Sequence, residues 1–516
     1  MNVGDQIRRS VARFADRPAA ICGVETLSFA EIDIRSNRLA NALLALGLKK
    51  GDRVAALLEN SIRCVELDFA LAKAGLVRVS LNPRSTAKDT SYILTDSEAP
   101  VFIYGSGFSD IAAAVQTDAG HVRYWISVDE GEGGAGAQAS DYEDVLAKAN
   151  PDPVDAKCDP EDLYCLFYTS GTTGRPKGVM LSHRAILHVS FNLLMEIGPQ
   201  VPGEKILLMQ PMSHGAGFFV LPWFMRGGVS VIMRHFDPDE VLRLADELEI
   251  ETIKLVPTML QRLLRVDTAK SASLPRLRQI VYGASAMPAE ALRKAVARFG
   301  VRFVQIYGQS EAPVTLSILP IEEHDPASDH PERLTSSGVP WPTVEVRIVD
   351  TDGNEVEPGQ AGEVVLRAPH LMSGYWKRPD LTESTIRDGW LHTKDFGRLD
   401  EHGFLYLLGR TDEMIISGGY NIAPREIEDA LYLHPEVQEA AVIGEPDEEW
   451  GSAVVAYVAL RNGVRESEIA DFAKAQLGFK RPKRIYRVKE LPKNANGKIQ
   501  KSALKPELAM LWEAVA

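Results

Sequence analysis

The sequence has little cysteine, and none of it is arranged for metal binding. The 516 residues include only Cys22, Cys64, Cys158 and Cys165, which lie far apart and show no metal-ligand spacing. Free cysteines of this kind are typical of protein interiors. We therefore expect four reduced, buried thiols and a cytoplasmic protein.

Long hydrophobic runs are also missing. No apolar stretch reaches the length of a membrane-spanning helix. Residues 1–16 mix Arg8, Arg9 and Arg13 with acidic and small residues, and so lack the apolar segment of a secretory signal. The sequence therefore predicts no integral membrane segment.

Positive charge is in the minority. The chain has 57 Lys and Arg against 71 Asp and Glu, a net charge of −14, which argues against a general nucleic-acid binder. The balance is reversed locally near the C-terminus, at Lys480, Arg481, Lys483, Arg484, Arg487 and Lys489. Such a run attracts phosphate groups, although it is more often simply a solvated face.

The length and the hydrophobic pattern predict an α/β protein of at least two domains. In the first part, apolar strands at 53–58, 77–81 and 101–104 alternate with helices such as 29–46. The alternation resumes with strands at 163–168, 206–209, 229–233, 253–256, 279–282 and 303–307, and with helices at 239–249 and 288–299. Two α/β halves in series, each with a parallel sheet, are the expected result.

The pattern changes after Gly338. Segments 344–349, 362–367 and 404–408 are rich in β-formers and separated by Gly and Pro, which favours a small barrel or twisted sheet. A unit of about a hundred residues follows Arg410, a size suited to a separate domain. The stretch 129–139, rich in Gly, Ala and acidic residues, is expected to be a loop.

The strongest functional signal is the segment 168–178, Tyr-Thr-Ser-Gly-Thr-Thr-Gly-Arg-Pro-Lys-Gly. It follows an apolar strand and precedes a helix predicted from His183. Its glycines let backbone N–H groups turn toward an anion, and Lys177 adds a charge, so the segment suits a polyphosphate. It is not a Walker A loop, because Pro176 and Gly178 replace the Gly-Lys-Ser/Thr order. The alternative is an ordinary surface loop.

Two further clusters lie at predicted strand ends. Tyr307-Gly-Gln-Ser-Glu-Ala312 follows the strand 303–307, where open α/β sheets bind ligands, and Glu311 there suits Mg²⁺. Alone, Glu311 is more often a charge at a helix N-terminus. Asp395 and Arg410 suit the hydroxyls of a ribose, although each by itself is an ordinary surface residue.

The last cluster is Pro492-Lys-Asn-Ala-Asn-Gly-Lys-Ile499. Its Asn-Gly pair predicts a tight turn that would display Lys498.

Taken in order, these segments resemble the adenylate-forming superfamily, which includes acyl-CoA synthetases, aryl-CoA ligases, firefly-type luciferases and peptide-synthetase adenylation domains. The resemblance covers nearly the whole chain. It rests on the segments above together with Pro211-Met-Ser-His-Gly215, Ser417-Gly-Gly-Tyr-Asn421 and Pro424-Arg-Glu-Ile-Glu428.

The resemblance implies a particular domain plan. A large N-terminal domain, residues 1–411, would contain two α/β subdomains and a small β-barrel. A mobile α+β C-terminal domain, residues 412–516, would close the site and turn about a hinge at Asp412.

The resemblance also implies a role for each matching residue. Thr169, Ser170, Gly171, Thr172, Thr173, Gly174 and Lys177 would hold the β- and γ-phosphates of ATP. Gly283, Ala284, Ser285 and Tyr307 would hold adenine, with Gly308, Gln309 and Ser310 lining the nucleotide site and Ser310 at the α-phosphate. Asp395 and Arg410 would bind ribose.

The remaining roles concern catalysis, the acid and the thiol. Glu311 and Thr169 would hold Mg²⁺, and Lys498 would bridge the carboxylate and the α-phosphate. His214 would act at the mouth of an acyl pocket shared with Phe218, Gly283 and Gly308. Ser417, Gly418, Gly419 and Lys480 would contact coenzyme A.

Three departures from the family pattern stand out. Lys394 lies beside Asp395 where Gly is usual, and it is expected to alter the charge near the ribose. Asn494 and Asn496 replace hydroxyl residues around the terminal Gly-Lys pair. Ser310 replaces the commoner Thr and keeps the hydroxyl.

The leading hypothesis is an ATP-dependent acid–CoA ligase that forms an acyl-adenylate and then an acyl-CoA. The alternative is a stand-alone adenylation enzyme that loads a carrier-protein thiol. A luciferase-like oxygenase, or an ATP-binding protein without catalysis, fits the residues less well.

The substrate class is an apolar acid. The run Gly215-Ala-Gly-Phe-Phe-Val-Leu-Pro-Trp223 favours an aryl or medium- to long-chain aliphatic acid, and the small Gly283 and Gly308 were expected to leave space beside Phe218. Core packing alone also gives such a run. The partners are then the acid, ATP and coenzyme A, and a homodimer is compatible with the sequence.

Overall fold

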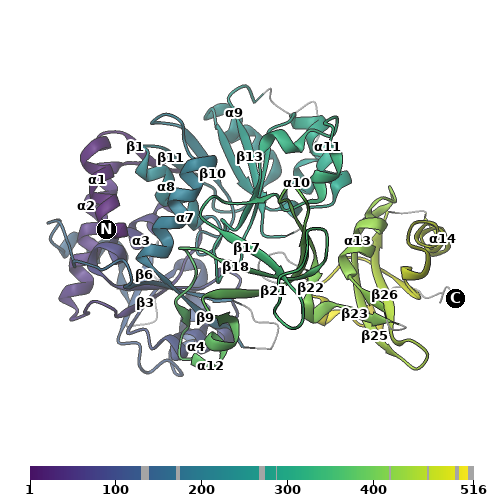
Figure 1. Ribbon diagram of the computed structural model, residues 1–516. Coiled ribbons are helices and arrows are strands. Elements are labelled where there is room, and N and C mark those ends of the chain that lie inside the picture. Colours follow the sequence, from purple (N-terminus) through teal and green to yellow (C-terminus); the bar gives the residue numbers. More distant parts are fainter. Residues whose placement is uncertain are drawn as a thin grey trace.

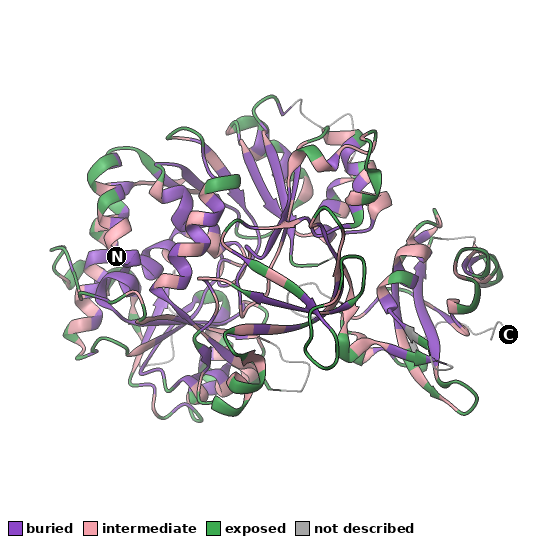
Figure 2. Ribbon diagram, in the orientation of Figure 1, coloured by how far each residue is buried: buried purple, intermediate pink, exposed green. Residues whose placement is uncertain are grey.

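Two large β-sheets form the centre of the structure, a computed structural model that describes residues 1–128, 139–169, 175–266, 274–285, 287–417, 420–461, 464–493 and 499–508. Figure 1 shows helices against these sheets and the C-terminal segment at one side of the molecule. Figure 2 shows the central strands as mostly buried and the outer faces of the helices as exposed. The α/β fold class predicted from the sequence is confirmed.

The first sheet is mainly parallel. Its described strands run in the order β19 (Gly374–Tyr375), β9 (Lys177–Ser182), β8 (Leu163–Thr169), β4 (Val77–Ser80), β3 (Arg53–Leu57), β5 (Val101–Gly105), β6 (Tyr124–Val128) and β7 (Ser140–Asp141). All five residues of β5 are buried, as expected for a strand with both faces covered.

The second sheet carries the predicted strands between 206 and 307. Its order is β16 (Val339–Pro340), β15 (Ser317–Leu319), β14 (Phe303–Tyr307), β13 (Gln279–Gly283), β12 (Thr252–Leu255), β10 (Lys205–Leu208), β11 (Val229–Ile232), β1 (Pro18–Cys22) and β2 (Glu25–Ser28). The expectation of two halves strictly in series is wrong in one respect. The N-terminal hairpin β1–β2 joins this second sheet, with Ala20 beside Ser230.

The helices are α1 (Val3–Phe14), α2 (Phe29–Ala45), α3 (Ile62–Ala74), α4 (Ala87–Ser97), α5 (Ser109–Val115), α6 (Tyr142–Lys148), α7 (His183–Glu196), α8 (Val220–Met225), α9 (Pro238–Glu247), α10 (Pro257–Leu263), α11 (Ala289–Phe299), α12 (Pro379–Thr385), α13 (Pro424–Tyr432) and α14 (Glu466–Leu477). Local chemistry explains where they begin. Ser28 and Glu31 form a reciprocal capping box at α2, and Pro238 is at the first position of α9. None of the helices in the described part of the chain combines the length and apolar character needed to cross a bilayer.

The β-rich region forms an antiparallel sheet, in the order β17 (Glu345–Val349), β18 (Gly362–Arg367), β21 (Trp390–Leu399) and β20 (Ile386–Arg387), with β22 (Leu405–Arg410) also paired to β21. A short 3₁₀ turn, Thr411–Glu413, follows β22.

The C-terminal segment has its own apolar clusters. It contains the hairpin β23 (Ile415–Ser417) and β24 (Tyr420–Ile422), and the sheet β25 (Val437–Asp447), β26 (Gly451–Leu460) and β27 (Arg484–Val488). Its two clusters of buried residues are drawn entirely from residues 415–504. This supports a separate unit, while the boundary at residue 412 stays a prediction. The loop expected at 129–139 lies outside the described residues except for Ala139.

The four cysteines are free and buried, as predicted. Burial raises the pKa of the Cys64 and Cys158 thiols to about 11, which keeps both protonated at neutral pH.

Three buried histidines are expected to make the folded protein less stable at acidic pH. Burial lowers the pKa of His183 and His324 to about 4 and of His370 to about 3, against about 6.5 in an unfolded chain. Between pH 6.5 and 4 the unfolded chain therefore binds more protons, so the free energy of unfolding decreases as the pH falls, by on the order of 3 kcal/mol per histidine at most.

Denaturant titrations at pH 7.5, 6 and 5 test this expectation. Replacing the three histidines by Gln, singly, is expected to reduce the slope between pH 6.5 and 5. A free energy of unfolding that is constant over this range would contradict the expectation.

Candidate active site

Parallel strands β13 and β14 bring two of the predicted motifs to one edge of the second sheet. Gly283, the last residue of β13, lies beside Ile306 of β14, so residues 283–285 and 307–311 leave the sheet together. Ala284 has the left-handed φ of 74° and, like Ser285, is exposed at this edge. The carboxyl ends of the strands thus carry an open surface, where doubly wound folds bind ligands.

The two predicted glycines do not create open space, contrary to the expectation. A Cβ atom added at Gly283 would lie 2.3 Å from the carbonyl oxygen of Ile306, and one at Gly308 would lie 2.3 Å from the amide nitrogen of Val314. Both glycines therefore permit close approach of two backbone segments. Their proximity to bound ligand stays a prediction.

Asp395 is the centre of a hydrogen-bonded cluster. It is 9% exposed and lies opposite Arg410 in the β21–β22 ladder. Its carboxylate accepts hydrogen bonds from the hydroxyl of Tyr307, from Nε2 of Gln309 at 2.6 Å and from Nη1 of Arg410 at 3.2 Å. The third sequence motif is thereby joined to the second, although the two are more than 80 residues apart. Burial and the Asp395 charge raise the pKa of Tyr307 well above its usual range, so its hydroxyl remains a donor.

Glu311 lies in an irregular segment between β14 and β15. Its Oε1 accepts a hydrogen bond of 2.6 Å from the hydroxyl of Tyr375, and its carbonyl accepts one from the amide of Met372. No helix begins within the segment 308–316, so the alternative that Glu311 is a helix-terminus charge is wrong. None of the described residues donates to its Oε2, which is therefore available to a cation or to water.

Tyr375 connects Glu311 to the phosphate-loop strands. It pairs with Val179 of β9, and the ammonium of Lys177 lies 5.4 Å from the centre of its ring. Sequence reasoning missed this tyrosine, because a Gly-Tyr-Trp triplet between strands has no pattern that separates it from ordinary packing. Its position makes it the residue that holds Glu311 and Lys177 in one cluster.

The predicted phosphate segment is the connection of a β-hairpin. Thr169 at the end of β8 is paired with Lys177 at the start of β9, and α7 begins only after β9, at His183. Ser170, Gly171, Thr172, Thr173 and Gly174 lie outside the described residues. Their predicted contacts with phosphate therefore remain predictions, anchored by the two described ends of the hairpin.

Four charged groups act on the ammonium of Lys177: the cations of Lys394, Arg378 and Arg410, and the carboxylate of Glu311. Burial lowers the pKa of its ammonium, the positive charge of Lys394 lowers it further, and the negative charge of Glu311 opposes both. Within the described part of the chain, no carboxylate forms an ion pair with Lys177. The ammonium of Lys177 is thus a cation with one acidic neighbour, Glu311, at the C-terminal end of the predicted phosphate loop.

His214 and Phe218 line a cavity between the two halves of the N-terminal region. The lining also includes Asp68, Phe69, Arg78, Ser80, Tyr164, Cys165, Phe167, Ile186, Met212, Ser213, Gly217, Val220 and Leu221. The rings of His214 and Phe218 lie 5.0 Å and 5.8 Å from that of Phe167. The free volume is about 40 Å³, close to the share of one water molecule in the liquid. A larger ligand therefore enters only if side chains such as Phe218 move.

A buried ion pair is part of this cavity. Arg78 donates to Asp68, and the remaining carboxylate oxygen of Asp68 has no described hydrogen-bond partner. Burial raises the pKa of Asp68 to about 6 against the opposing charge of Arg78. Burial and the charge of Arg78 lower the pKa of His214 to about 4, so its ring is neutral at pH 7. No pattern in the sequence indicates the ion pair, since both residues lie within otherwise apolar runs.

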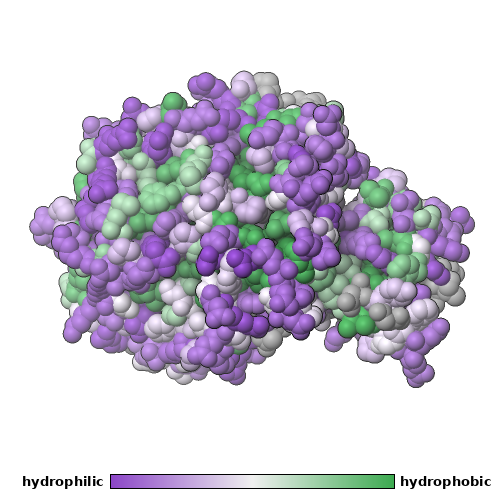
Figure 3. Space-filling view, in the orientation of Figure 1, coloured by the Kyte–Doolittle hydropathy of each residue, from purple (hydrophilic) through white to green (hydrophobic). Residues whose placement is uncertain are grey.

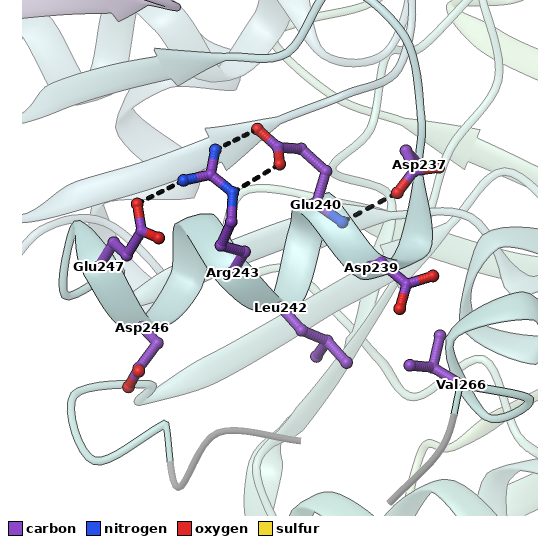
Figure 4. A pocket seen from close by; sticks show the side chains of 8 residues that line it. All are labelled: Asp237, Asp239, Glu240, Leu242, Arg243, Asp246, Glu247 and Val266. Carbon is purple, nitrogen blue, oxygen red and sulfur yellow. Dashed lines mark hydrogen bonds and ion pairs between the residues drawn. The ribbon is translucent and has the colours of Figure 1, made fainter. Parts of the chain in front are cut away.

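A second hollow, of about 450 Å³, lies on the surface beside α9 and is drawn in Figure 4. Asp237, Asp239, Glu240, Asp246 and Glu247 line it, and its one arginine, Arg243, is engaged by Glu240 and Glu247. Its negative charge disfavours anionic ligands. Among the described residues, no group of three or more His, Cys, Asp or Glu side chains is arranged to hold a metal ion.

Only some of the residues predicted to act in the C-terminal domain lie within the described part of the chain. Gly418, Gly419 and Lys498 lie outside the described residues. Ser417 is buried at the end of β23, Lys480 forms an ion pair of 2.7 Å with Glu426, and Asp412 lies 3.6 Å from Nε of Arg410. The basic run is also partly neutralised, because Arg484 is paired with Glu445 and Asp447. Figure 3 shows a surface that is mostly hydrophilic on this face, with hydrophobic atoms in its recessed parts.

Family models match most of the chain. Residues 7–376 match the model described as AMP-binding enzyme, and residues 426–498 match the model described as AMP-binding enzyme C-terminal domain. The second match ends on Lys498.

Relatives of known name match over nearly the full length. A medium/long-chain-fatty-acid–CoA ligase of Mycobacterium tuberculosis is 35% identical, over 98% of this chain and 89% of the relative. A feruloyl-CoA synthase of an Amycolatopsis species is 35% identical, over 94% of each chain. A fatty acid–[acyl-carrier-protein] ligase of Streptomyces coeruleorubidus is also 35% identical, over 95% of this chain and 93% of the relative.

Solved structures agree with these matches. The amide bond synthetase of Marinactinospora thermotolerans superposes with a TM-score of 0.88 at 28% identity, covering 97% of this chain and 99% of that chain. The plan of a large N-terminal and a small C-terminal part is therefore shared.

Proposed function

Because this chain belongs to the AMP-binding enzyme family, the adenylate-forming acid–thiol ligases, we propose that it joins an apolar carboxylic acid to coenzyme A at the expense of ATP. The single observation that carries the proposal is the cluster at the edge of the second sheet. There Asp395 and Arg410, which suit a ribose, lie beside Glu311, Tyr375 and Lys177, which suit a polyphosphate and its metal ion.

The first step forms an acyl-adenylate. A carboxylate oxygen of the acid attacks the α-phosphorus of ATP, and the bond to the β,γ-pyrophosphate breaks so that pyrophosphate leaves with its electron pair. Two anions must approach each other, so cations and N–H donors have to offset their repulsion. Lys177 is proposed to contact the departing phosphates, and Lys498 is proposed to bridge the carboxylate and the α-phosphate.

Glu311 fits a magnesium ligand. Mg²⁺ at nucleotide sites uses one or two carboxylates together with phosphate oxygens and water, so a single carboxylate is sufficient. Oε1 of Glu311 is fixed by Tyr375, which leaves Oε2 for the ion, and Thr169 at the end of β8 is the second proposed ligand. The ion would neutralise charge on the phosphates, while the protein fixes the direction of the carboxylate.

The second step transfers the acyl group. The sulfur of the thiol attacks the acyl carbon, the thiol proton is lost to solvent, the carbon–oxygen bond to the phosphate breaks, and AMP leaves with its electron pair. The neutral ring of His214 lines the cavity and is proposed to lie at its mouth, where it would neither attract nor repel the carboxylate strongly. Ser417 and Lys480 are proposed for coenzyme A, and Lys480 would have to release Glu426 to bind it.

An apolar acid is supported by the aromatic side of the cavity, formed by Phe167 and Phe218. The carboxylate of Asp68 offers no net negative charge to the ammonium group of an amino acid, because the charge of Arg78 already offsets it. We therefore expect fatty or aryl acids to be accepted and free amino acids to be rejected.

A panel of acids tests the proposal. Release of AMP is followed with coenzyme A, and exchange of labelled pyrophosphate into ATP is followed without it. CoA-dependent release with aryl or aliphatic acids is expected. Exchange with amino acids and none with apolar acids would contradict the proposed substrate class. Release of AMP only with a phosphopantetheinyl carrier protein would instead establish the carrier-loading alternative, which one of the relatives represents.

Asp412 is proposed as the hinge between the two steps. Asp412→Pro is expected to spare pyrophosphate exchange and to slow thioester formation from pre-made acyl-adenylate by on the order of tenfold or more, because proline fixes φ near one conformer. Asp412→Ala is the matched control, since it removes the contact with Arg410 and leaves φ free. Equal loss of both steps in the proline variant would assign residue 412 a purely structural role.

A further inference from the structure

Lys394 has a backbone conformation that a lysine rarely adopts. Its φ is +60°, in the left-handed region, and it lies within a bulge of β21 where the register with β18 shifts. The bulge is held on both sides: the amide of Lys394 donates to Oε1 of Glu363 at 3.1 Å, and its carbonyl accepts from Oγ1 of Thr411 at 3.2 Å. Glycine would relieve the strain at this position, so the lysine side chain requires another explanation.

The side chain projects from the nucleotide cluster. Its neighbours in sequence, Thr393 and Asp395, are buried and hydrogen-bonded to Gln309 and Arg410, whereas Lys394 itself is exposed. No carboxylate in the described ranges forms an ion pair with its ammonium. A strained bulge thus presents an unneutralised cation next to the proposed ribose site.

Lys177, a second cation without a carboxylate partner among the described residues, belongs to the same cluster. Asp395, next to Lys394, accepts a hydrogen bond from Gln309, two residues before Glu311, and Tyr375 contacts both Glu311 and Lys177. Apart from burial, the positive charge of Lys394 has the largest effect on the pKa of Lys177, which it lowers, and it exceeds the opposing effect of Glu311. Two ammonium groups in one cluster repel each other, and an anion bound between them relieves the repulsion. The charge arrangement therefore fits a ligand with several negative charges.

We propose that Lys394 is a binding residue for the polyphosphate of the nucleotide, acting together with Lys177. The proposal rests on the proposed function, since ATP and pyrophosphate are the polyanions of that reaction. Lys394 would act while the β- and γ-phosphates are present. It would have no part in thioester formation, which takes place after pyrophosphate has left.

The variant Lys394→Gly separates an effect on binding from an effect on stability. Its thermal stability is expected to rise, whereas its affinity for ATP is expected to fall. Removing a left-handed lysine is expected to raise the Tm by on the order of 1–2 °C. Removing the cation is expected to raise the KM for ATP, and the inhibition constant of pyrophosphate, by about tenfold, the scale of one charge-assisted contact. The kcat and the rate from pre-made acyl-adenylate are expected to stay near the wild-type values, and Lys394→Arg is expected to keep the ATP affinity.

Lys157→Gly is the matched control. Lys157 also has a left-handed φ, of 51°, but its ammonium is paired with Asp155 at 2.6 Å, in a segment whose backbone bonds to Asn2 and Lys73. We expect a similar small change in Tm and no change in the KM for ATP.

Calorimetry with a non-hydrolysable ATP analogue, in the absence of the carboxylic acid substrate, tests the role of Lys394 independently of the proposed reaction. An unchanged analogue affinity in Lys394→Gly would overturn the role of Lys394, whichever acid the enzyme uses. An equal loss in both half-reactions would overturn it too, since that is the result of a structural defect. Absence of acyl-adenylate in the wild type, with normal analogue binding, would instead overturn the proposed function.

Discussion

Glu311→Gln is expected to lower the rate of acyl-adenylate formation at least about a hundredfold, with little change in stability. The amide keeps the shape of the side chain and can still accept the hydrogen bond from Tyr375. It loses the negative charge that makes the carboxylate a ligand for a hard cation. The measurement is pyrophosphate exchange across a range of Mg²⁺ concentrations, together with the Tm.

The control for this variant is Glu345→Gln on β17. Glu345 forms an ion pair with Arg367, but both side chains are more than half exposed, so the change is expected to be mild in rate and in stability. Near-normal exchange by Glu311→Gln at saturating Mg²⁺ and ATP would show that Glu311 is not a metal ligand. A large fall in Tm would show that its bond with Tyr375 matters mainly for folding.

Local sequence patterns predict the strands of the two sheets but not all of the strand pairings. Strands such as β5 and β12 were predictable because both of their faces are covered, which leaves a continuous apolar run in the sequence. The pairing of β1 with β11 was not predictable, because it joins Ala20 to Ser230 across two hundred residues and leaves no trace in either segment. The hydrophobic periodicity of a segment indicates which of its faces is buried, but it does not indicate which strand pairs with it.

The candidate site divides in the same way. Glu311 and Asp395 could be selected because each lies in a motif that resembles a known family. Tyr375 could not, since its importance comes from the two groups it touches and not from its surroundings in the chain. The glycines at 283 and 308 were selected for the wrong physical reason: tight backbone packing and open space both require the absence of a side chain, and only coordinates separate them.

Lys498→Ala is expected to suppress acyl-adenylate formation on the order of a hundredfold or more, the scale for losing a positioned charge that stabilises a transition state. Lys498 lies outside the described residues, and the assignment rests on the Gly497-Lys498 motif in the family match that ends there. The described cluster contains Arg410, which is proposed to bind ribose, and Lys177, which is proposed to bind the outer phosphates. A cation that joins the acid to the α-phosphate has to come from elsewhere, which is the role proposed for the C-terminal domain.

The two half-reactions separate this role from a general defect. Pyrophosphate exchange reports the first step, and thioester formation from pre-made acyl-adenylate reports the second. Lys498→Ala is expected to be severely slowed in the first and close to the wild type in the second, because the lysine is proposed to bridge only the reactants of adenylation.

Lys493→Ala is the neighbouring control. Lys493 is already paired with Glu439 at 2.5 Å, so it is not free to reach a substrate, and its loss is expected to change stability by less than about 1 kcal/mol and the rate little. If Lys498→Ala kept normal pyrophosphate exchange, the lysine would not be catalytic, and the C-terminal domain would lose its proposed part in the first step. If both half-reactions fell equally, the C-terminal turn would be required for folding or closure, and the specific contact with the α-phosphate would be excluded.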